Sequence, residues 1–478
     1  MKNIIGRENE IRRLDRAMAE KEAQLIVVYG RRRVGKTFLI DEYFSGDFAF
    51  KFTGSEKQKN REQLKNFILE LSAAAYTELD VPGDWTEAFF ALRGYLESLK
   101  GESKRVVFLD ELPWMDKQNS GFLNAFEWFW NSWGASQKDL IFIVCGSATS
   151  WMVEKLDENK GGLFNRQTCR LYLEPFDLNN TELYLHSRNI FWSRYDIVQV
   201  YMIMGGIPFY LRLLDSELSL NENIDRIFFR KRAELWNEFE HLYHTLFSNS
   251  EQYIKIAAAL SEKRSGLNRA EIVKKTGLPA NGNLSKMLSN MEKSGFVRIN
   301  PKYGNRKREM QYQLSDYYSL FYFRFIKENY GKDEHFWSNT NDNPARRAWA
   351  GLTFEQVCKD HIDQIKQKLG ITGVLTEISA WSNPGNDQEN GAQIDLVIDR
   401  RDRVINLCEI KFSEHEYEID KDYDRSLKNK AAVFRDVTKS KKTIIMTMIT
   451  TYGIKKNMYS NFVGKEVCMD DLFLRGMI

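Results

Sequence analysis

A glycine-rich segment with one lysine and one threonine is the strongest chemical signal in this sequence. Gly30, Gly35, Lys36 and Thr37 form the pattern G-x-x-x-x-G-K-T, between an apolar run and the helical pattern FLIDEYF. In such a loop the backbone N–H groups surround phosphates, the lysine reaches the β- and γ-phosphates, and the threonine hydroxyl can ligate Mg²⁺. The alternative is a chance match in a glycine-rich turn. The segment predicts a nucleoside triphosphate site with contacts from Gly30, Arg31, Arg32, Arg33, Val34, Gly35, Lys36, Thr37 and Phe38.

A pair of carboxylates, Asp110 and Glu111, follows the apolar run 106–109. Acidic residues at the carboxyl end of a buried strand lie at the ligand-binding edge of a parallel sheet, next to the glycine loop. We expect Asp110 to hold Mg²⁺ with Thr37, and Glu111 to orient or polarise the attacking water. An acidic pair at a strand–loop junction is common by itself, so the prediction of hydrolysis depends on the loop.

Two further polar residues lie beside later apolar runs. Ser147 follows the run 140–145, where it can contact the γ-phosphate or the water, or alternatively cap the next helix. Arg166 precedes the run 169–173 and is a candidate γ-phosphate sensor or arginine finger. A solvated arginine is the alternative there.

Carboxylates and a lysine also gather near the C-terminal end. Two apolar strand patterns flank the charged turn 399–402, which predicts a β-hairpin. The hairpin would place Asp395 beside Glu409, and period-2 alternation puts Lys411 on the same face as Glu409. This set suits metal-dependent phosphodiester cleavage: Asp395 and Glu409 would bind Mg²⁺ or Mn²⁺, and Lys411 would activate or orient the water.

The elements that must position the nucleotide residues alternate along the chain. Helical patterns separate the strand-like runs, which predicts an α/β fold with a parallel sheet and helices on both faces. From residue 176 the pattern becomes helical as far as residue 247. The expected strands are 25–29, 48–52, 105–109, 140–145 and 169–173.

Residues 251–314 have a different character, with three helical patterns and then two strand patterns joined by a basic loop. Three helices followed by a β-hairpin wing predict a winged helix-turn-helix. Its charges suit DNA-backbone binding with little sequence readout, and a protein-interaction or packing module is the alternative. The candidate contacts are Asn283, Ser285 and Lys286 in the third helix, and Lys302, Arg306, Lys307 and Arg308 in the wing.

Length, net charge and cysteine content limit the classes of function and location that these predictions allow. The chain has 478 residues and a net charge of +3, so any nucleic-acid surface must be local. Its five cysteines form no C-x-x-C pair, which predicts reduced thiols in a cytoplasmic protein. Neither a membrane span nor the apolar core of a signal peptide is expected.

The order of several short segments resembles the archaeal ATPase family of AAA+/STAND-like P-loop proteins over the first half of the chain. The resemblance implies that the nucleotide is ATP and that residues 176–247 form a helical lid in which Pro208 lies close to the adenine. The segments are GRENEI, GRRRVGKT, VVFLDE, GSA, GLFNR and MGGIPFYL.

The C-terminal part resembles the PD-(D/E)XK nuclease superfamily, through Asp395, Glu409 and Lys411 with Glu355 on an upstream helix. The resemblance implies that Glu355 is a further metal ligand. It leaves open whether the domain cleaves DNA or serves as an inactive DNA-binding shell. The expected domains are an ATPase core at 1–175, a helical lid at 176–247, a winged helix-turn-helix at 248–330 and a nuclease-like domain at 344–478.

The order of these modules predicts an ATPase that couples nucleotide state to DNA binding or processing by the tail. The alternative is a STAND-type regulatory switch, in which slow hydrolysis times a conformational state and the tail binds protein. The expected partners are ATP and DNA, with a protein partner or a second copy of the chain left open.

Overall fold

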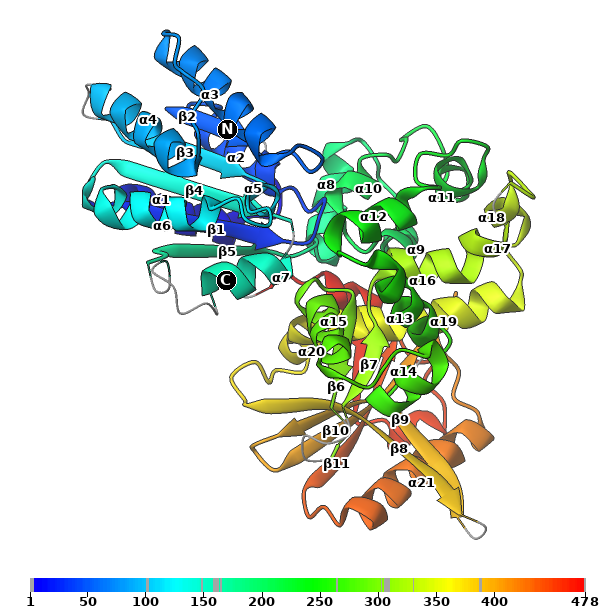
Figure 1. The fold of residues 1–478 in the computed structure, drawn as a ribbon. Helices are drawn as coiled ribbons and strands as arrows, with labels where there is room; N and C mark the ends of the chain where they lie inside the picture. The colour runs from blue at the N-terminus through cyan, green and yellow to red at the C-terminus, as the bar shows by residue number, and fades with distance from the viewer. Residues whose placement is uncertain are drawn as a thin grey trace. The chain divides into compact units, whose positions relative to one another are not determined.

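The chain folds as two compact units, Met1–Pro175 and Phe176–Ile478 (Figure 1). The structure is a computed structural model. It describes residues 4–99, 103–147, 149–157, 163, 166–263, 265–301, 303–304, 310–329, 331–386 and 389–476. No helix within these ranges has the length and apolar character needed to cross a membrane.

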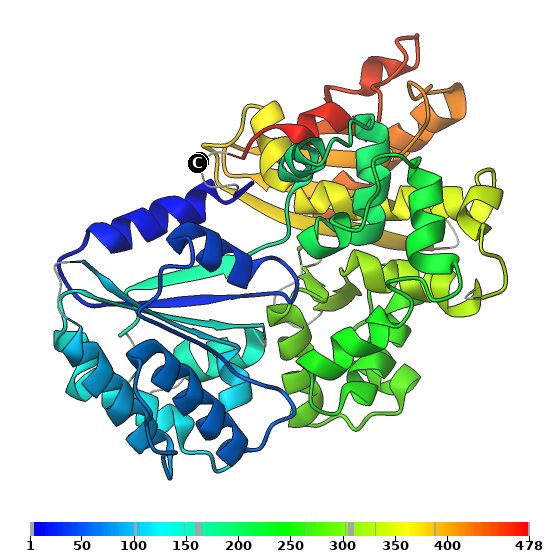
Figure 2. The same ribbon diagram turned by 90° about the horizontal axis from the view of Figure 1, so that it is seen from above.

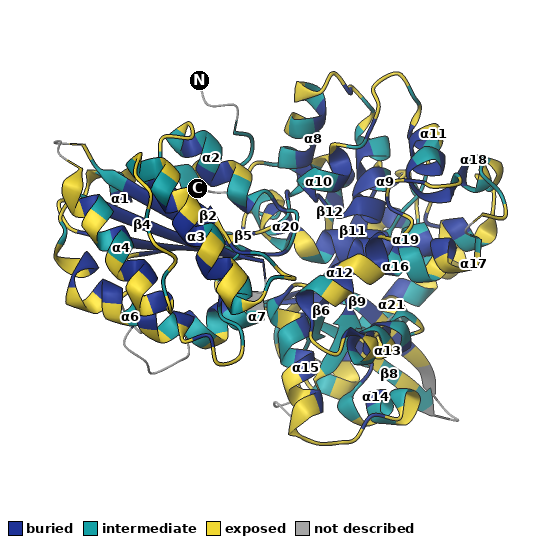
Figure 3. Ribbon diagram, turned by 45° about the horizontal axis from the view of Figure 1, so that its top comes forward, coloured by how far each residue is buried: buried dark blue, intermediate teal, exposed yellow. Residues whose placement is uncertain are grey.

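The first unit is built on the parallel sheet that the alternating pattern predicts. Its strand order is β2-β3-β4-β1-β5, and every neighbouring pair is parallel. The central strands are almost wholly apolar and buried, as expected for strands covered on both faces (Figure 3). The strands are β1 (Gln24–Gly30), β2 (Phe50–Thr53), β3 (Arg105–Asp110), β4 (Leu140–Gly146) and β5 (Cys169–Leu173).

Helices cover both faces of this sheet (Figure 2). The helices α1 and α2 lie on one face, while α3, α4 and α6 lie on the other, where a cluster of aromatic side chains joins them to β2 and β4. The helices are α1 (Glu8–Ala19), α2 (Lys36–Phe44), α3 (Asn60–Ala75), α4 (Trp85–Ser98), α5 (Leu112–Met115), α6 (Phe122–Ser132) and α7 (Thr149–Met152), followed by the π-helical segment η2 (Val153–Asp157).

The second unit begins with a run of helices. Gly205 and Gly206 both have positive φ and end α9, and Pro208 begins α10 at a position where its missing N–H is tolerated. The helices of this part are α8 (Leu178–Ser187), α9 (Arg194–Met204), α10 (Pro208–Leu211), α11 (Leu220–Ile224) and α12 (Glu238–Leu246), with the π-helical segment η3 (Asp225–Phe229) after α11.

Three helices and a two-stranded antiparallel sheet follow. Asn268 caps α14 and Asn281 caps α15, each by accepting hydrogen bonds from backbone N–H groups of the first turn. The elements are α13 (Ser250–Ser261), α14 (Arg269–Thr276), α15 (Gly282–Lys293), β6 (Val297–Asn300) and β7 (Gln311–Leu314).

The unit ends in a mixed five-stranded sheet of order β12-β11-β10-β9-β8. The predicted hairpin is confirmed, because β9 and β10 pair antiparallel around the charged turn. The elements are α16 (Tyr317–Phe321), η4 (Tyr322–Ile326), α17 (Lys327–Asn329), α18 (Phe336–Asn339), α19 (Pro344–Asp360), α20 (Ile362–Lys368), β8 (Thr376–Asn386), β9 (Glu389–Arg400), β10 (Val404–Lys411), α21 (Lys421–Thr438), β11 (Thr443–Thr450), η5 (Ser460–Phe462), β12 (Lys465–Cys468) and η6 (Met469–Phe473).

Candidate nucleotide-binding site

The glycine loop connects the end of β1 to the start of α2, as the sequence predicts. Gly30 has φ +144°, and a Cβ there would lie 2.4 Å from the backbone oxygen of Leu173. Gly35 caps α2 in the left-handed conformation with φ +91°. Both positions therefore require glycine, because a side chain would clash at the first and strain the backbone at the second.

Lys36 is buried inside this loop. Its Nζ donates hydrogen bonds to the backbone oxygens of Gly30, at 3.0 Å, and Arg31, at 2.9 Å. Burial lowers the pKa of Lys36, whereas the nearby charges of Glu111 and Asp110 act in the opposite direction. An ammonium shielded from water at a loop of this shape attracts an anion strongly.

Thr37 and Asp110 come together from α2 and β3. The Thr37 hydroxyl donates to Asp110 Oδ2 at 2.7 Å, and Asp110 Oδ1 accepts from the backbone N–H of Glu111 at 2.9 Å. A hydroxyl oxygen and a buried carboxylate are the hard oxygen ligands that Mg²⁺ takes beside phosphates. These two residues therefore fit the metal that the sequence predicts.

Glu111 lies at the same edge of the sheet, with a positive φ of 51°. Its Oε2 accepts hydrogen bonds from the hydroxyl of Ser147, at 2.9 Å, and from the Ser147 backbone N–H, at 3.2 Å. Burial raises the pKa of Glu111, the charge of Asp110 raises it further, and Lys36 and Ser147 oppose the rise. The carboxylate is thus fixed by Ser147 while its own charge is disfavoured.

The remaining predicted residues differ in their surroundings. Arg32 Nη1 is buried and has no hydrogen-bond partner within the described ranges, and a phosphate oxygen would satisfy it. Phe38 and Arg166 are exposed, whereas Arg31 and Val34 are buried. Arg33 adopts a positive φ of 72°.

Pro208 lies in the second unit, directly after two glycines with positive φ. A Cβ on Gly206 would lie 2.1 Å from the backbone oxygen of Phe176, so the turn before Pro208 packs closely against the residue that starts this unit. The predicted contact of Pro208 with adenine stays a prediction.

Two residues that sequence reasoning missed lie beside the predicted site residues. Arg7 Nη2 donates to the backbone oxygen of Val34 at 3.0 Å and so supports the loop from the start of α1. Cys145, at the end of β4, is buried next to Asp110 and Lys36, and burial raises the pKa of its thiol. The signal for Cys145 was its place on β4, whose carboxyl end meets the same sheet edge as Asp110.

The predicted C-terminal carboxylates differ in burial: Glu409 is enclosed in the protein, whereas Asp395 and Glu355 line a cleft. Glu409 is 1% exposed. Its carboxylate receives hydrogen bonds from Lys430 Nζ at 2.7 Å and from the Tyr423 hydroxyl at 3.2 Å, both on α21. Burial raises the pKa of Glu409, and Asp395 raises it further, while Lys430 lowers it. The Lys430 ion pair was not anticipated.

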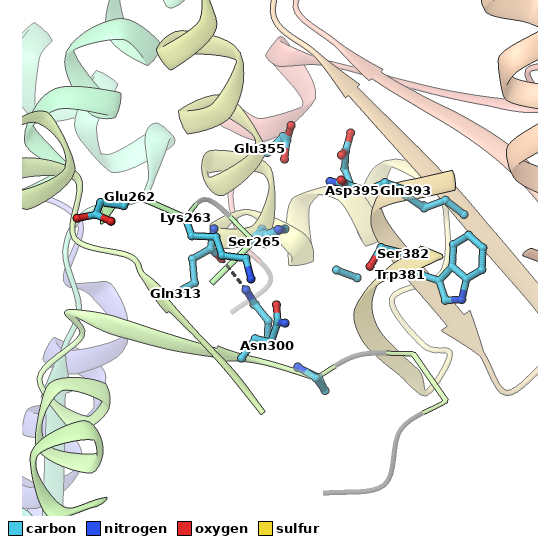
Figure 4. Close-up of a pocket in the computed structure, with 15 residues that line it drawn as sticks. Glu262, Lys263, Ser265, Asn300, Gln313, Glu355, Trp381, Ser382, Gln393 and Asp395 are labelled. Carbon is cyan, nitrogen blue, oxygen red and sulfur yellow. Dashed lines mark hydrogen bonds between the residues drawn. The ribbon is translucent and has the colours of Figure 1, made fainter. Parts of the chain in front are cut away.

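Asp395 and Glu355 line a cleft of about 400 Å³ between β9, α19 and the β6–β7 hairpin (Figure 4). Asp395 Oδ2 accepts from the backbone N–H of Ile410 at 3.4 Å. Lys411 Nζ lies 5.3 Å from the ring centroid of Tyr423. Among the described residues, no three His, Cys, Asp or Glu side chains are grouped closely enough to hold a metal ion.

The predicted nucleic-acid contacts are only partly described. Asn283, Ser285 and Lys286 are exposed on the first turns of α15. The predicted wing residues Lys302, Arg306, Lys307 and Arg308 lie outside the described residues. All five cysteines are unpaired, and four of them are buried.

Residues 4–214 match the model of a family described as an ATPase domain predominantly from Archaea. An uncharacterized protein of Methanocaldococcus jannaschii is 24% identical over 445 residues, which are 92% of this chain and 92% of that protein. An uncharacterized ATP-binding protein of the same organism is 49% identical over 40 residues, 8% of this chain and 68% of that protein.

Solved structures that match this chain include a Walker-type ATPase of Pyrococcus abyssi, with a TM-score of 0.47 and 18% identity over 68% of this chain and 97% of that one. The ORC2 protein of Aeropyrum pernix has a TM-score of 0.42 and 13% identity over 76% of this chain and 98% of that one. Residues 4–214, which contain the glycine loop, are thus similar to an ATPase domain found predominantly in Archaea.

Proposed function

We propose that the chain hydrolyses ATP in a Mg²⁺-dependent reaction at the loop between β1 and α2. The contact of the Thr37 hydroxyl with Asp110, beside a Glu111 fixed by Ser147, carries this proposal. Mg²⁺ held by Thr37 and Asp110 would neutralise charge on the β- and γ-phosphates.

Side chains of this chain bind the phosphates and orient the attacking water. Lys36 binds the phosphates from inside the loop, where its charge is shielded from water. Glu111 accepts a hydrogen bond from the attacking water and orients it, and Ser147 keeps that carboxylate in place. Because its position is fixed before substrate binds, Glu111 needs little reorganisation during the reaction.

The test compares two substitutions in the full chain. Lys36→Ala should remove both ATP binding and phosphate release. Glu111→Gln should keep ATP binding and lower the rate of phosphate release by about 100-fold or more, as for loss of a general base. Lys51→Ala and Glu97→Gln, partly exposed residues that pair with Asp41 and Arg93, are the matched controls. An unchanged rate in Glu111→Gln would contradict the proposed role.

We propose further that the second unit binds DNA through the part formed by α13, α14, α15 and the β6–β7 hairpin. The support is the order of these elements, with the exposed polar residues Asn283, Ser285 and Lys286 at the start of the third helix. Contacts of this kind would favour phosphates over bases, so binding should depend strongly on salt and weakly on sequence.

Charge reversal at Lys286 tests DNA binding. Lys286→Glu should weaken binding of duplex DNA and reduce the dependence of log K on log salt by about one. Lys421→Glu, an exposed lysine at the start of α21, is the control. If the wild-type chain binds no DNA with or without ATP, the alternative of a regulatory switch with a protein-binding tail is favoured.

Metal-dependent DNA cleavage is the narrower form of this proposal. Its support is that Glu355 and Asp395 line one cleft next to the β6–β7 hairpin. Cleavage requires Glu409 to lose its ion pair with Lys430 and bind a metal ion instead. DNA binding alone does not require this change and is therefore the broader proposal. Nicking with Mg²⁺ or Mn²⁺ that disappears in Asp395→Asn, with DNA binding retained, would support cleavage. DNA bound but never nicked would contradict it.

A further inference from the structure

A second cavity in the second unit has no assigned role. Its volume is about 730 Å³, within the range of pockets that hold small organic ligands. The walls come from the first turns of α9, α11 and α19 and from the segment that follows β10. The glycine loop lies in the other unit, and the carboxylates Asp395 and Glu355 line a different cleft.

Arg346 lines this cavity as a buried cation, with 7% of its surface exposed. Its guanidinium donates to the backbone oxygen of Trp337 at 2.7 Å and to Asn221 Oδ1 at 2.9 Å. No carboxylate of the described ranges forms an ion pair with it, although Asp225 contributes a more distant favourable charge. Buried cations in proteins are normally paired, so this arrangement leaves room for an anionic ligand.

The surroundings of Arg346 strengthen this expectation. Its guanidinium lies 3.7 Å from the ring centroid of Trp337, which fixes its plane. Burial lowers the pKa of Arg346 to about 10, so the group stays charged at neutral pH.

The helix that carries Arg346 begins in an unusual way. Asn343 caps α19, and its first turn contains Arg346 and the exposed Arg347 but no acidic residue. Two cations at the positive end of a helix repel the helix dipole, where acidic residues are the favourable choice. An anion in the cavity would offset the repulsion between the two arginines and the helix dipole. The two guanidinium groups have hydrogen-bond donors in positions that suit the oxygens of a phosphate.

Aromatic and acidic side chains also line the cavity. Tyr195 stacks on Phe412, with ring centroids 5.0 Å apart and an interplanar angle of 8°. The partly exposed Trp192 also lines the cavity, and its ring has no aromatic contact within the described part of the chain. Asp196, Asp342 and Glu414 supply carboxylates to the cavity. An aromatic ring suits a base, and a carboxylate suits the hydroxyl groups of a ribose.

From these observations we infer that the cavity binds a nucleotide carrying one phosphate. Arg346 and Arg347 hold the phosphate, Trp192 stacks on the base, and Glu414 and Asp196 accept hydrogen bonds from the ribose. The ligand is either a free nucleoside monophosphate or the 5′-phosphorylated end of a nucleic-acid strand, because both present the same groups. This inference does not depend on ATP hydrolysis by the first unit.

The test measures binding of adenosine monophosphate to the full chain by calorimetry. The chain carries Lys36→Ala, and the probe lacks the β- and γ-phosphates that the glycine loop holds, so the first unit contributes little. Arg347→Ala and Trp192→Ala should each weaken binding by about tenfold, as for loss of one charge-assisted hydrogen bond or one stacking contact. Arg425→Ala, an exposed arginine on α21, should leave binding unchanged.

Two further arms complete the test. Adenosine should bind at least about tenfold more weakly than the monophosphate, since the arginines would have no phosphate to hold. A 5′-phosphorylated oligonucleotide that displaces the monophosphate identifies a strand end, whereas failure to displace it identifies the free nucleotide. The inference is overturned if the monophosphate does not bind, if adenosine binds equally well, or if Arg347→Ala and Trp192→Ala leave binding unchanged.

Discussion

Glu111 is fixed by surroundings that also disfavour its charge. Its carboxylate is bound by Ser147, while burial and Asp110 raise its pKa. A carboxyl group whose pKa is raised by folding destabilises the protein at pH values above its unfolded pKa, and this cost disappears as the pH falls below that value. The residue expected to orient the water is therefore also a source of instability at neutral pH.

Replacing Glu111 by Gln should stabilise the first unit at pH 8. We expect the Tm to rise by about 2–4 °C, the shift that 1 kcal/mol produces in a unit of this size. The gain should shrink at pH 5, because Glu111 then approaches its protonated form. Thermal unfolding of both proteins at the two pH values measures the effect. A gain independent of pH would show that charge is not its cause, and Glu97→Gln should change Tm little.

Sequence could predict which residues of the candidate nucleotide site lie together, because their spacing is local. Gly30 to Thr37 form one continuous loop, and Asp110 and Glu111 end a single apolar strand. Lys430 was missed because its contact with Glu409 depends on how α21 packs on the sheet. A signal did exist, since Leu427, Lys430 and Phe434 share one face of that helix and the first and last are buried.

The ion pair of Lys430 with Glu409 joins α21 to β10. Glu409 is almost fully buried, so removing Lys430 leaves an uncompensated carboxylate in the protein interior. Lys430→Met should destabilise the second unit by about 3 kcal/mol. The loss should be larger at pH 8 than at pH 5, because without Lys430 the pKa of Glu409 rises further. Denaturant unfolding at both pH values measures it.

Two variants control this prediction. Glu409→Gln combined with Lys430→Met should recover more than half of the lost stability, because no buried charge remains. Arg425→Met removes an exposed ion pair with Asp422 on the same helix and should cost about 0.5 kcal/mol or less. Equal losses in Arg425→Met and Lys430→Met would contradict a special role for the buried pair.

The turn between α9 and α10 depends on glycine. Gly206 has φ +64°, and a Cβ there would lie 2.1 Å from the backbone oxygen of Phe176. Gly206→Ala should therefore destabilise the second unit by about 3 kcal/mol, from backbone strain together with the steric clash. Gly351→Ala is the matched control, because Gly351 lies within α19 with open space around it. It should stabilise that helix by about 0.5–1 kcal/mol.

The strand and helix periodicities predicted the elements of the first sheet well, because apolar runs of this length are a strong signal. β2 begins at Phe50 rather than at Phe48, a shift of the size expected at element ends. Sequence could not show the order of the strands, in which β1 lies between β4 and β5, since that order depends on contacts between distant segments. The parallel pairing of β10 with β11 likewise could not be predicted from the local sequence pattern.

At the scale of the molecule, the two units have separate cores and should unfold separately. ATP with Mg²⁺ should raise the midpoint of one calorimetric transition and leave the other unchanged, because ligand binding stabilises the unit that holds the site. At a ligand concentration 100 times Kd the expected stabilisation is about 2.7 kcal/mol. Lys36→Ala should abolish the shift, and a shift of both transitions would indicate coupling between the units.

Two contacts of α8 affect when this helix can fold during translation. The backbone N–H of Leu178 donates to the buried ring of His361 at 2.9 Å, and Asn179 Nδ2 donates to the backbone oxygen of Phe473 at 3.2 Å. The start of the second unit is thus completed by residues translated much later. On the ribosome, the first unit can fold as it emerges, whereas α8 can complete its contacts only after the segment that contains Phe473 has been translated. A nascent chain stalled before residue 469 should hold a folded ATPase core and a protease-sensitive remainder.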